Sequence, residues 1–192
     1  MILLFYFKDF AFIKIGHVVG HKKYVDDLKN GGFKMTRLKG LSLFSSVGLA
    51  ETYFKNYDID IKIANELTDV RAKFHKHLYP DCKMIVGDIT QEKIKQEIID
   101  EAIQEKCDFV IATPPCQGMS LAGLRKKDDV RNRLILDAVE IIQKIKPKFI
   151  IFENVPIQLK TSIYVDDEWV MIPNYLKSTL GDMYFFLIRK MF

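Results

Sequence analysis

The chain has 192 residues, 48% of them hydrophobic and 28% charged, which is the composition of one compact globular domain and leaves no room for a second full domain. Its net charge of +4 fits a polyanionic partner but also fits many proteins that never meet one, so charge alone decides little. Its three cysteines, Cys82, Cys107 and Cys116, are odd in number and form no CxxC pair. Their pattern argues against a disulfide framework or a metal site of the zinc type, and it favours a reducing compartment, by default the cytoplasm.

Residues 1–34 begin with an apolar run at residues 2–7, but this run does not predict a signal peptide or a membrane span. No basic segment precedes it, charged residues interrupt it early, and nothing approaches the ~20 apolar residues of a span. Two interpretations remain open: an extra strand or helix packed on the domain, or sequence translated ahead of a natural start near Met35. A pair of glycines just before the ordered pattern favours the second. We therefore treat residues 1–34 as an extension and residues 35–160 as the core.

From Lys39 onward, short apolar runs alternate with longer amphipathic ones. The pattern predicts strands at residues 41–44, 61–64, 84–86, 109–112 and 149–152, and helices at residues 49–57, 68–78, 91–106 and 130–145. Strict alternation predicts an α/β fold with a mainly parallel sheet covered by helices on both faces. Ligands of such folds gather where the strands end, so functional residues are expected just after each strand.

The alternation degrades after Val155. Residues 163–172 are typical of a hairpin that turns at Asp166 and Asp167, and residues 173–180 predict a short helix. The final residues, 185–192, form an apolar and basic stub. We therefore treat residues 161–192 as an incomplete C-terminal segment.

The first two strands end in features that could surround a ligand. Ser45, Ser46 and Gly48 form a turn of small residues, which lets backbone amides approach a ligand, although a simple turn is the alternative. Glu66 follows about 20 residues beyond the turn, the usual offset of an acid that holds ribose hydroxyls in nucleotide-binding folds. The alternative is that Glu66 caps the helix that starts near Asp69.

The third strand ends in Asp88 and Ile89, which could accept from an adenine amino group and lie against the ring. Asp88 or Thr90 could equally be the N-cap of a helix from Gln91. The turn, Glu66 and Asp88 all fall on one edge of the predicted sheet and together describe a pocket for an adenosine-containing ligand. No GxxxxGK[ST] motif is present, so a triphosphate is not the expected anchor.

The fourth strand leads into Pro114, Pro115 and Cys116. Two prolines fix their own φ and restrict the residue before each, so Cys116 is presented in a defined direction, as a nucleophile requires. A thiol needs nearby positive charge, a helix terminus or desolvation to raise its thiolate fraction, and the sequence does not indicate which of these acts here. Cys82 and Cys107, each beside a strand, are instead interpreted as buried spectators.

The fifth strand ends in Glu153 and Asn154. A carboxylate that follows a run of Phe and Ile is expected to be partly desolvated, which raises its pKa and lets it hold or deliver a proton near neutral pH. In the alternative, Glu153 pairs with Lys146 or Lys148. One crossover joins the fourth and fifth strands, so Cys116 and Glu153 can end side by side over a substrate.

The ordered set FSSVG, ANE, GDIT, PPCQGMS, DVRNRL and ENV resembles motifs I to VI of the DNA cytosine methyltransferases that methylate carbon 5, over roughly residues 38–160. The resemblance implies a Rossmann-like fold that binds S-adenosyl-L-methionine. The residues that it implies for the cofactor are Phe44 and Gly48 at the methionine end, Glu66 on the ribose, Asp88 and Ile89 on the adenine, and Pro115 and Leu134 lining the site.

The chemistry of this family gives each of the two polar residues a role. The thiolate of Cys116 would add to carbon 6 of a cytosine while Glu153 hydrogen-bonds or protonates ring N3, so that carbon 5 takes the methyl group. A base then removes the carbon 5 proton, and the thiol is eliminated. The cytosine must be flipped out of stacked DNA to reach the pocket. The DNA-contacting residues that the resemblance implies are Gln117, Ser120 and Arg131.

The sequence departs from the family in two places. The turn after the first strand has Ser46 and Leu49 where glycine is usual, which could loosen cofactor packing. Residues 160–192 contain no glutamine and arginine motif, no recognition domain that reads bases and no C-terminal motif that completes the cofactor site.

These departures leave four hypotheses open. The chain could be the catalytic half of a restriction-modification methyltransferase whose recognition half is a separate polypeptide, or a truncated remnant without activity. It could also be a binding module for an adenosine ligand, although intact Cys116 and Glu153 argue against that. Finally, it could act on cytosine in tRNA.

Overall fold

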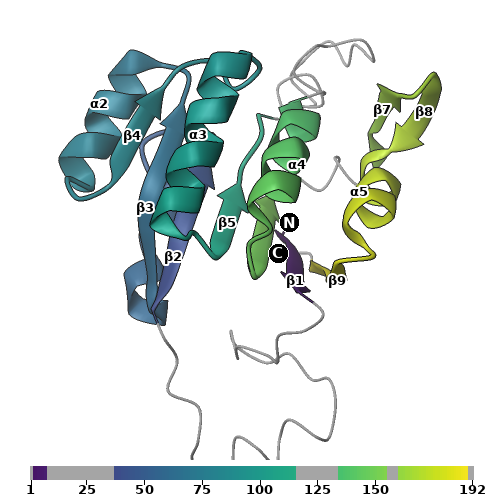
Figure 1. Ribbon diagram of the computed structural model, residues 1–192, viewed down its shortest axis with the longest axis horizontal. Helices are drawn as coiled ribbons and strands as arrows, with labels where there is room; N and C mark the ends of the chain where they lie inside the picture. The colour runs from purple at the N-terminus through teal and green to yellow at the C-terminus, as the bar shows by residue number, and fades with distance from the viewer. Residues whose placement is uncertain (1, 8–36, 116–133, 155–159, 190–192) are drawn as a thin grey trace, which may run out of the picture.

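The computed structural model describes residues 2–7, 37–115, 134–154 and 160–189, which form a seven-stranded sheet, a two-stranded ribbon and flanking helices (Figure 1). The strands of the large sheet are β1 (Ile2–Phe7), β2 (Leu38–Leu43), β3 (Ile59–Glu66), β4 (Lys83–Val86), β5 (Phe109–Ala112), β6 (Phe149–Glu153) and β9 (Tyr184–Arg189), in the order β4-β3-β2-β5-β6-β1-β9. The α-helices are α2 (Asp69–Leu78), α3 (Glu92–Glu105), α4 (Leu134–Ile145) and α5 (Ile172–Leu180).

Five neighbouring strands, from β4 through β3, β2 and β5 to β6, are parallel. Their registers align Leu43 of β2 with Ala112 of β5, and Ala112 with Phe152 of β6. The carboxyl ends of these strands therefore lie along one edge of the sheet. This confirms the predicted α/β architecture, and β5 has the bounds predicted from the sequence.

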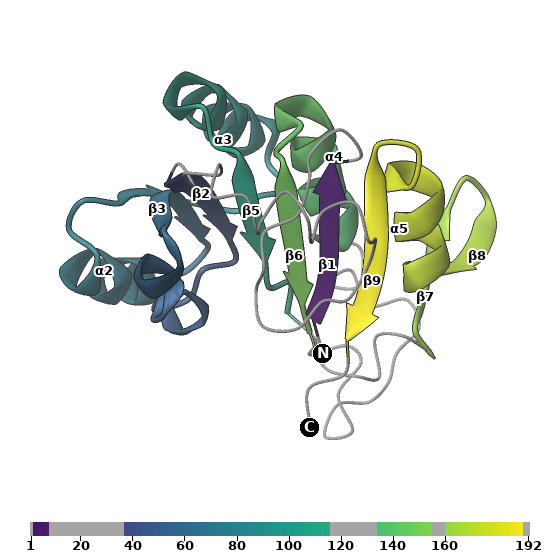
Figure 2. The same ribbon diagram turned by 90° about the horizontal axis from the view of Figure 1, so that it is seen from below.

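Helices lie on both faces of the sheet. Figure 2, seen from below, shows α3 and α4 along one side and α2 on the opposite side, beside β3. The predicted helix over residues 49–57 is wrong: the structure has two 3-10 helices there, η1 (Leu49–Glu51) and η2 (Phe54–Tyr57). Five residues of the segment, Thr52, Tyr53, Phe54, Asn56 and Tyr57, have lower helix propensity than Ala or Leu, because side-chain freedom is lost in a helix or a polar side chain competes for backbone hydrogen bonds.

The predicted hairpin after residue 160 is confirmed as β7 (Ser162–Val165) and β8 (Glu168–Met171), with Asp166 and Asp167 both at positive φ in the turn. Helix α5 likewise confirms the short helix predicted at residues 173–180. The interpretation of residues 185–192 as a stub is wrong for residues 185–189, because they belong to β9 and pair with β1.

Strand β1 lies between β6 and β9 and is antiparallel to both, with Leu4 opposite Ile151 on one side and Leu187 on the other. Residues 2–7 thus contribute a strand to the sheet, as in the interpretation of an extra strand packed on the domain. Residues 8–34 lie outside the described residues.

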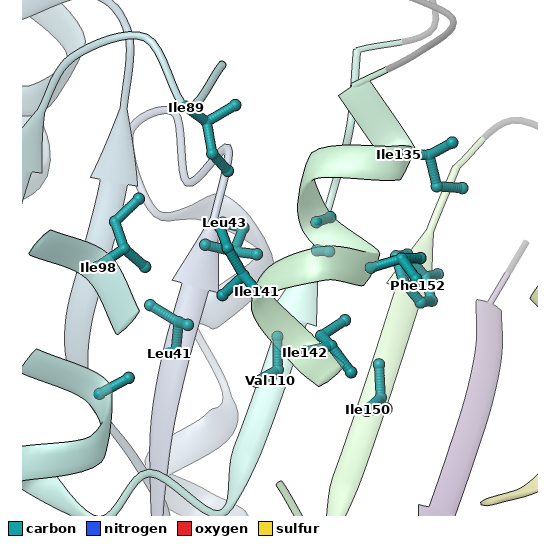
Figure 3. Packing of buried hydrophobic residues seen from close by; sticks show 14 of the residues in the cluster. Leu41, Leu43, Ile89, Ile98, Val110, Ile135, Ile141, Ile142, Ile150 and Phe152 are labelled. Atoms are coloured by element: carbon teal, nitrogen blue, oxygen red, sulfur yellow. The ribbon is translucent and has the colours of Figure 1, made fainter. Parts of the chain in front are cut away.

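The larger core cluster fills the space between the sheet and helices α3 and α4 (Figure 3). Ile98 of α3 and Ile141 of α4 are fully buried, as are Leu41 and Val110 on the strands beneath them. Burying side chains of this size stabilises the fold by about 1.5–3 kcal/mol each. The tight packing fixes the strand ends that carry the site.

A smaller cluster covers the opposite face of the sheet. There the ring of Phe54 from η2 packs edge-on against Phe109, with the ring centroids 5.3 Å apart. Cys82 and Tyr79 join this cluster. The face beneath η2 and α2 is therefore also packed, which holds the turn after β2 from behind.

An ion-pair network joins the two helices above the sheet. The ammonium of Lys95 on α3 lies 2.9 Å from a carboxylate oxygen of Asp137 and 2.6 Å from one of Glu140, both on α4. Burial by itself would lower the pKa of Lys95, but these two carboxylates raise it above its ordinary value. The network fixes α3 against α4 by charge as well as by packing.

Candidate functional site

The turn after β2 is held in an uncommon backbone shape. Phe44, Ser46 and Gly48 all have positive φ, at 60°, 52° and 85°. The amide of Ser45 donates to the carbonyl of Asn65, and the amide of Gly48 donates back to the carbonyl of Ser45. Positive φ is costly for the two residues with side chains, so the surrounding structure must hold this turn in place.

Glu66, at the end of β3, is 5% exposed, and its carboxylate binds two backbone amides. One oxygen accepts from Ser46 N at 3.0 Å and the other from Thr68 N at 2.9 Å, while Arg71 Nη1 lies 3.7 Å away. Glu66 therefore connects the turn after β2 to the start of α2. The helix-capping alternative is partly right, since Thr68 is the N-cap residue of α2, although the amide of Ser46 is not part of that helix.

Asp88 follows β4 in a turn of its own. Its Oδ1 accepts from Thr90 N at 3.0 Å and from Thr90 Oγ1 at 2.8 Å. Helix α3 starts at Glu92 with Gln91 as its N-cap, so Asp88 shapes the approach to the helix rather than capping it. Ile89, between them, is 3% exposed.

These strand ends surround one cavity of about 300 Å³, which is at the lower limit of the roughly 300–1,000 Å³ typical of small-molecule pockets. The residues that line it are Phe44, Ser46, Asn65, Glu66, Leu67, Thr68, Arg71, Gly87, Asp88, Ile89, Thr113, Pro115 and Leu134. The sequence had singled out Phe44, Glu66, Asp88, Ile89, Pro115 and Leu134 for the cofactor, and the structure brings all six together. Their role as ligands remains a prediction.

Gly48 is the one predicted cofactor residue that does not line the cavity. Its carbonyl accepts a hydrogen bond of 2.8 Å from Tyr79 Oη. Conversely, sequence reasoning missed Asn65, Arg71 and Thr113. Nothing in the local pattern distinguishes these residues, although Asn65 is next to the last residue of β3, Arg71 is in the first turn of α2 and Thr113 directly follows β5.

Asn65 positions the loop that carries Asp88. Its side-chain nitrogen donates to the carbonyls of Ile85, at 3.0 Å, and Gly87, at 3.2 Å. Thr113, after β5, donates through Oγ1 to the carbonyl of Phe44 at 3.0 Å. The loops around the cavity are thus connected to one another by side chains from neighbouring strand ends.

The predicted catalytic and DNA-contacting residues are only partly described. Cys116, Gln117, Ser120 and Arg131 lie outside the described residues. Pro115 is described and lines the cavity. The position of the thiol therefore remains a prediction, while the backbone that leads to it is fixed.

Glu153 ends β6 with an exposed side chain, whereas the sequence predicted a partly desolvated one. The four preceding residues of β6 are buried, and burial stops at the edge of the sheet where Glu153 emerges. The alternative interpretation, in which Glu153 pairs with Lys148, is also wrong. Lys148 precedes β6, at the opposite end, and binds Asp108 at 2.9 Å.

Asn154 connects the end of β6 to the loop after β5. It is 4% exposed, and its Nδ2 donates to the carbonyl of Pro114 at 2.6 Å. Glu153 therefore neighbours a residue that contacts the backbone two positions before Cys116. The ends of β5 and β6 are held together at this point.

The other two cysteines have the properties of spectators. Cys82 and Cys107 are buried free thiols, and burial raises the pKa of each from 9.0 to about 12. Both are therefore protonated and unreactive at neutral pH. Among the described residues, no group of three His, Cys, Asp or Glu side chains could hold a metal ion. Within the same residues, no helix combines the length and apolar character needed to cross a membrane.

The family profile described as C-5 cytosine-specific DNA methylase matches residues 38–168. Two curated relatives are the Type II methyltransferase M1.HgaI of Avibacterium volantium and M.XorII of Xanthomonas oryzae pv. oryzae. The first is 41% identical over 152 residues, 77% of this chain and 43% of the relative. The second is 34% identical over 124 residues, 63% of this chain and 29% of the relative.

Solved structures of low sequence identity share the fold. A protein from an E. coli prophage, described as a DNA modification methyltransferase, has a TM-score of 0.57 at 24% identity over 76% of this chain and 38% of its own. DNMT2 of Spodoptera frugiperda has a TM-score of 0.54 at 21% identity, over 76% and 41%. In each of these four matches the chain spans less than half the length of the protein it resembles.

Proposed function

The chain belongs to the C-5 cytosine-specific DNA methylase family, and from that premise we propose that it transfers a methyl group from S-adenosyl-L-methionine to carbon 5 of cytosine in DNA. The observation that carries the proposal is that residues at the ends of β2, β3, β4 and β5 line one shared cavity. Its lining includes Phe44, Glu66 and Asp88, which follow or end three different strands.

The residues around the cavity fit the cofactor in order along the sheet edge. Ile89 offers an apolar surface for an adenine ring, and Asp88 beside it is an acceptor for the adenine amino group. Glu66 uses both oxygens on backbone amides, but a carboxylate has about four acceptor sites, which leaves capacity for ribose hydroxyls. When bound, the cofactor supplies a methyl group activated by its sulfonium.

The chain's own residues prepare the cytosine. In the proposed reaction the thiolate of Cys116 forms a bond to carbon 6, and Glu153 gives a hydrogen bond or proton at N3. The electron pair that moves to carbon 5 makes this carbon the atom that would accept the methyl group, while the sulfur–methyl bond breaks and S-adenosyl-L-homocysteine leaves. A base then takes the carbon 5 proton, the bond between Cys116 and carbon 6 breaks, and the thiolate is restored.

The contact between Asn154 and Pro114 supports a joint role for Cys116 and Glu153. It joins the backbone beside the acid to the backbone that precedes the thiol. An exposed Glu153 is compatible with this role if the flipped base itself removes water from the carboxylate.

We further propose that a second polypeptide supplies target recognition, as part of a restriction-modification system acting on DNA in the cytoplasm. The match covers 43% of M1.HgaI, so more than half of that relative has no counterpart among the matched residues of this chain. Within this chain, Gln117, Ser120 and Arg131 are the residues proposed to contact the flipped nucleotide or its phosphates. A base-reading partner would then add sequence specificity.

Calorimetry with S-adenosyl-L-methionine tests the cofactor site. Glu66→Ala is expected to weaken binding at least about tenfold, because it removes the ribose acceptor and leaves two amides unpaired. Glu97→Ala is the matched control, since Glu97 is exposed on α3 away from the cavity. Equal affinities for the native protein and Glu66→Ala would reassign Glu66 to a purely structural role, and an absence of binding to the native protein would contradict the proposal.

Methyl transfer is tested by incorporation of a labelled methyl group, with and without a candidate recognition polypeptide. Label in cytosine of duplex DNA that depends on both Cys116 and the second polypeptide is the expected result. Label in tRNA instead would move the substrate to RNA. No transfer in any combination, with cofactor binding intact, would identify an inactive remnant.

A further inference from the structure

We infer that Glu51, His75 and Tyr79 are positioning residues that hold the turn after β2 from behind and thereby set the affinity of the cavity for the amino-acid portion of its ligand. The inference rests on the proposed function, because it assigns a further role at the same cavity. None of these three residues belongs to the predicted cofactor set.

Tyr79 is the first contact of this support. Its hydroxyl donates to the carbonyl of Gly48 at 2.8 Å, and its ring fills the space beside that residue. A Cβ at position 48 would overlap the ring carbon Cε2 of Tyr79. The ring therefore fits against a bare backbone, and together with the φ of 85° this explains the requirement for glycine.

Glu51 and His75 form the second contact. His75 Nε2 lies 3.0 Å from Glu51 Oε2, and the two side chains are 0% and 1% exposed. The amide of Glu51 donates to the carbonyl of Gly48, and His75 stacks near Tyr79 with the ring centroids 4.8 Å apart. Helix α2, which carries His75, thus holds η1 and the turn in front of it.

The turn is held from the cavity side as well. Glu66 binds the amide of Ser46 there, and Phe44 and Ser46 line the cavity itself. Two opposed sets of contacts therefore define a turn that includes left-handed residues with side chains. Loosening either set lets those residues relax toward ordinary φ values and moves the cavity wall.

A buried polar cluster is a costly way to achieve packing alone. Among the described residues, Glu51 Oε1, His75 Nδ1 and Ser45 Oγ are buried without a hydrogen-bond partner. Buried ionisable pairs are often no more stabilising than apolar side chains of similar size. Because Glu51 and His75 lie directly behind the turn, we interpret the buried pair as fixing the geometry of the turn rather than as adding to the stability of the fold.

The position of the turn along the sheet indicates which part of a ligand it serves. Asp88 and Ile89 follow β4, Glu66 ends β3, and the turn follows β2, the next strand in the sheet. If the adenine of a ligand lies at Asp88 and Ile89 and its ribose lies at Glu66, the group attached beyond the ribose lies at the turn. For S-adenosyl-L-methionine, that group is the amino-acid chain.

The test compares two ligands on Tyr79→Phe, which removes a single oxygen. Dissociation constants are measured for S-adenosyl-L-homocysteine and for 5′-methylthioadenosine, which lacks the amino-acid group. We expect Tyr79→Phe to weaken the binding of S-adenosyl-L-homocysteine about five- to tenfold, as the loss of one hydrogen bond predicts. Binding of 5′-methylthioadenosine should weaken less than about twofold. Tyr57→Phe, at an exposed tyrosine of η2, is the matched control.

A second variant separates positioning from stability. Replacing Glu51 and His75 together by leucine removes the buried pair without leaving one partner alone. The thermal midpoint is expected to stay level or rise, while affinity for S-adenosyl-L-homocysteine falls by the same factor as in Tyr79→Phe.

The outcomes distinguish this inference from the function beneath it. The positioning role would be overturned if both variants kept the native affinities, or if the two ligands lost affinity equally. In either case, binding of S-adenosyl-L-homocysteine by the native protein would still support the proposed function. Failure of the native protein to bind S-adenosyl-L-homocysteine at all would remove the proposed function, and the inference with it.

Discussion

The side-chain amide of Asn154 donates a hydrogen bond of 2.6 Å to the carbonyl of Pro114, and so joins the end of β6 to the loop that leads to Cys116. Asn154 is 4% exposed, so this contact is made inside the protein. The contact connects the ends of β5 and β6. The proposed reaction requires the residues that follow or end these strands, Cys116 and Glu153, to lie side by side.

Asn154→Asp should therefore impair methyl transfer more than cofactor binding. The change places a carboxylate oxygen against a carbonyl oxygen and costs about 1–3 kcal/mol at a buried contact. We expect a fall in kcat of about tenfold or more with little change in the affinity for S-adenosyl-L-methionine. Asn56→Asp, at an exposed position of η2, is the control, and a kcat unchanged in both variants would show that the contact does not position the reacting groups.

Strand β1 predicts a second effect, far from the cavity. Because β1 pairs with β6 on one side and β9 on the other, proline at Leu4 removes a sheet hydrogen bond in the interior of the sheet. We expect Leu4→Pro to lower the free energy of unfolding by at least about 2 kcal/mol. Leu4→Val keeps the backbone donor and should cost far less in urea denaturation. Equal midpoints for the two variants would contradict the placement of β1 inside the sheet.

The network around Lys95 predicts a third effect. Lys95→Met leaves the carboxylates of Asp137 and Glu140 close together on α4 without their shared cation. Because these acids are partly exposed, we expect a loss of about 1–3 kcal/mol, below that of a fully buried pair. Lys93→Met, on the exposed side of α3, is the control, and similar denaturation curves for the two variants would reject the network as a source of stability.

The buried thiols give the protein a pH dependence in the alkaline range. The folded chain keeps the protons of Cys82 and Cys107 up to about pH 12, whereas the unfolded chain releases them near pH 9.0. The folded pKa values are raised, so this stability is present below pH 9.0 and is lost as the pH rises toward 12. The slope of the unfolding free energy against pH should be shallower in Cys107→Ala. An identical slope would indicate that the thiol is not buried in solution.

Alkylation at neutral pH offers a complementary measurement on the same residues. Cys82 and Cys107 are expected to react slowly with iodoacetamide in the folded protein, because burial raises the pKa of both. If Cys116 is the activated nucleophile, it should carry most of the label in a peptide map. Preferential labelling of Cys107 would contradict the assignment of roles among the three cysteines.

Much of the fold followed from local pattern. The runs that became β2 to β6 and the amphipathic segments that became α2, α3 and α4 are each long enough for apolar periodicity to identify them. The 3-10 helices of residues 49–57 were missed because the periodicity there is helical while the residues are poor helix formers. Strand β1 remained ambiguous because its partners, such as Glu153 opposite Ile2, are too distant in sequence for any local signal.

The cavity was predicted better than its supports. Glu66 and Asp88 could be assigned to one sheet edge from topology alone, since parallel strands end together. Arg71, Asn65 and Tyr79 could not, because their roles depend on which carbonyl or carboxylate a side chain meets after folding. The exposure of Glu153 was mispredicted for the same reason: the apolar run before it determines the strand but not where the sheet edge lies.

The central claim is that Cys116 attacks a cytosine while Glu153 contacts the same ring. Duplexes that carry 5-fluorocytosine test it most directly, because fluorine cannot leave carbon 5 as a proton does and the bond to the thiol is retained. With S-adenosyl-L-methionine and the recognition polypeptide present, mass spectrometry should find a covalent complex at Cys116 that is absent in Cys116→Ala and strongly reduced in Glu153→Gln. A complex that persists in Cys116→Ala, or native protein that forms none while binding both cofactor and DNA, would contradict the claim.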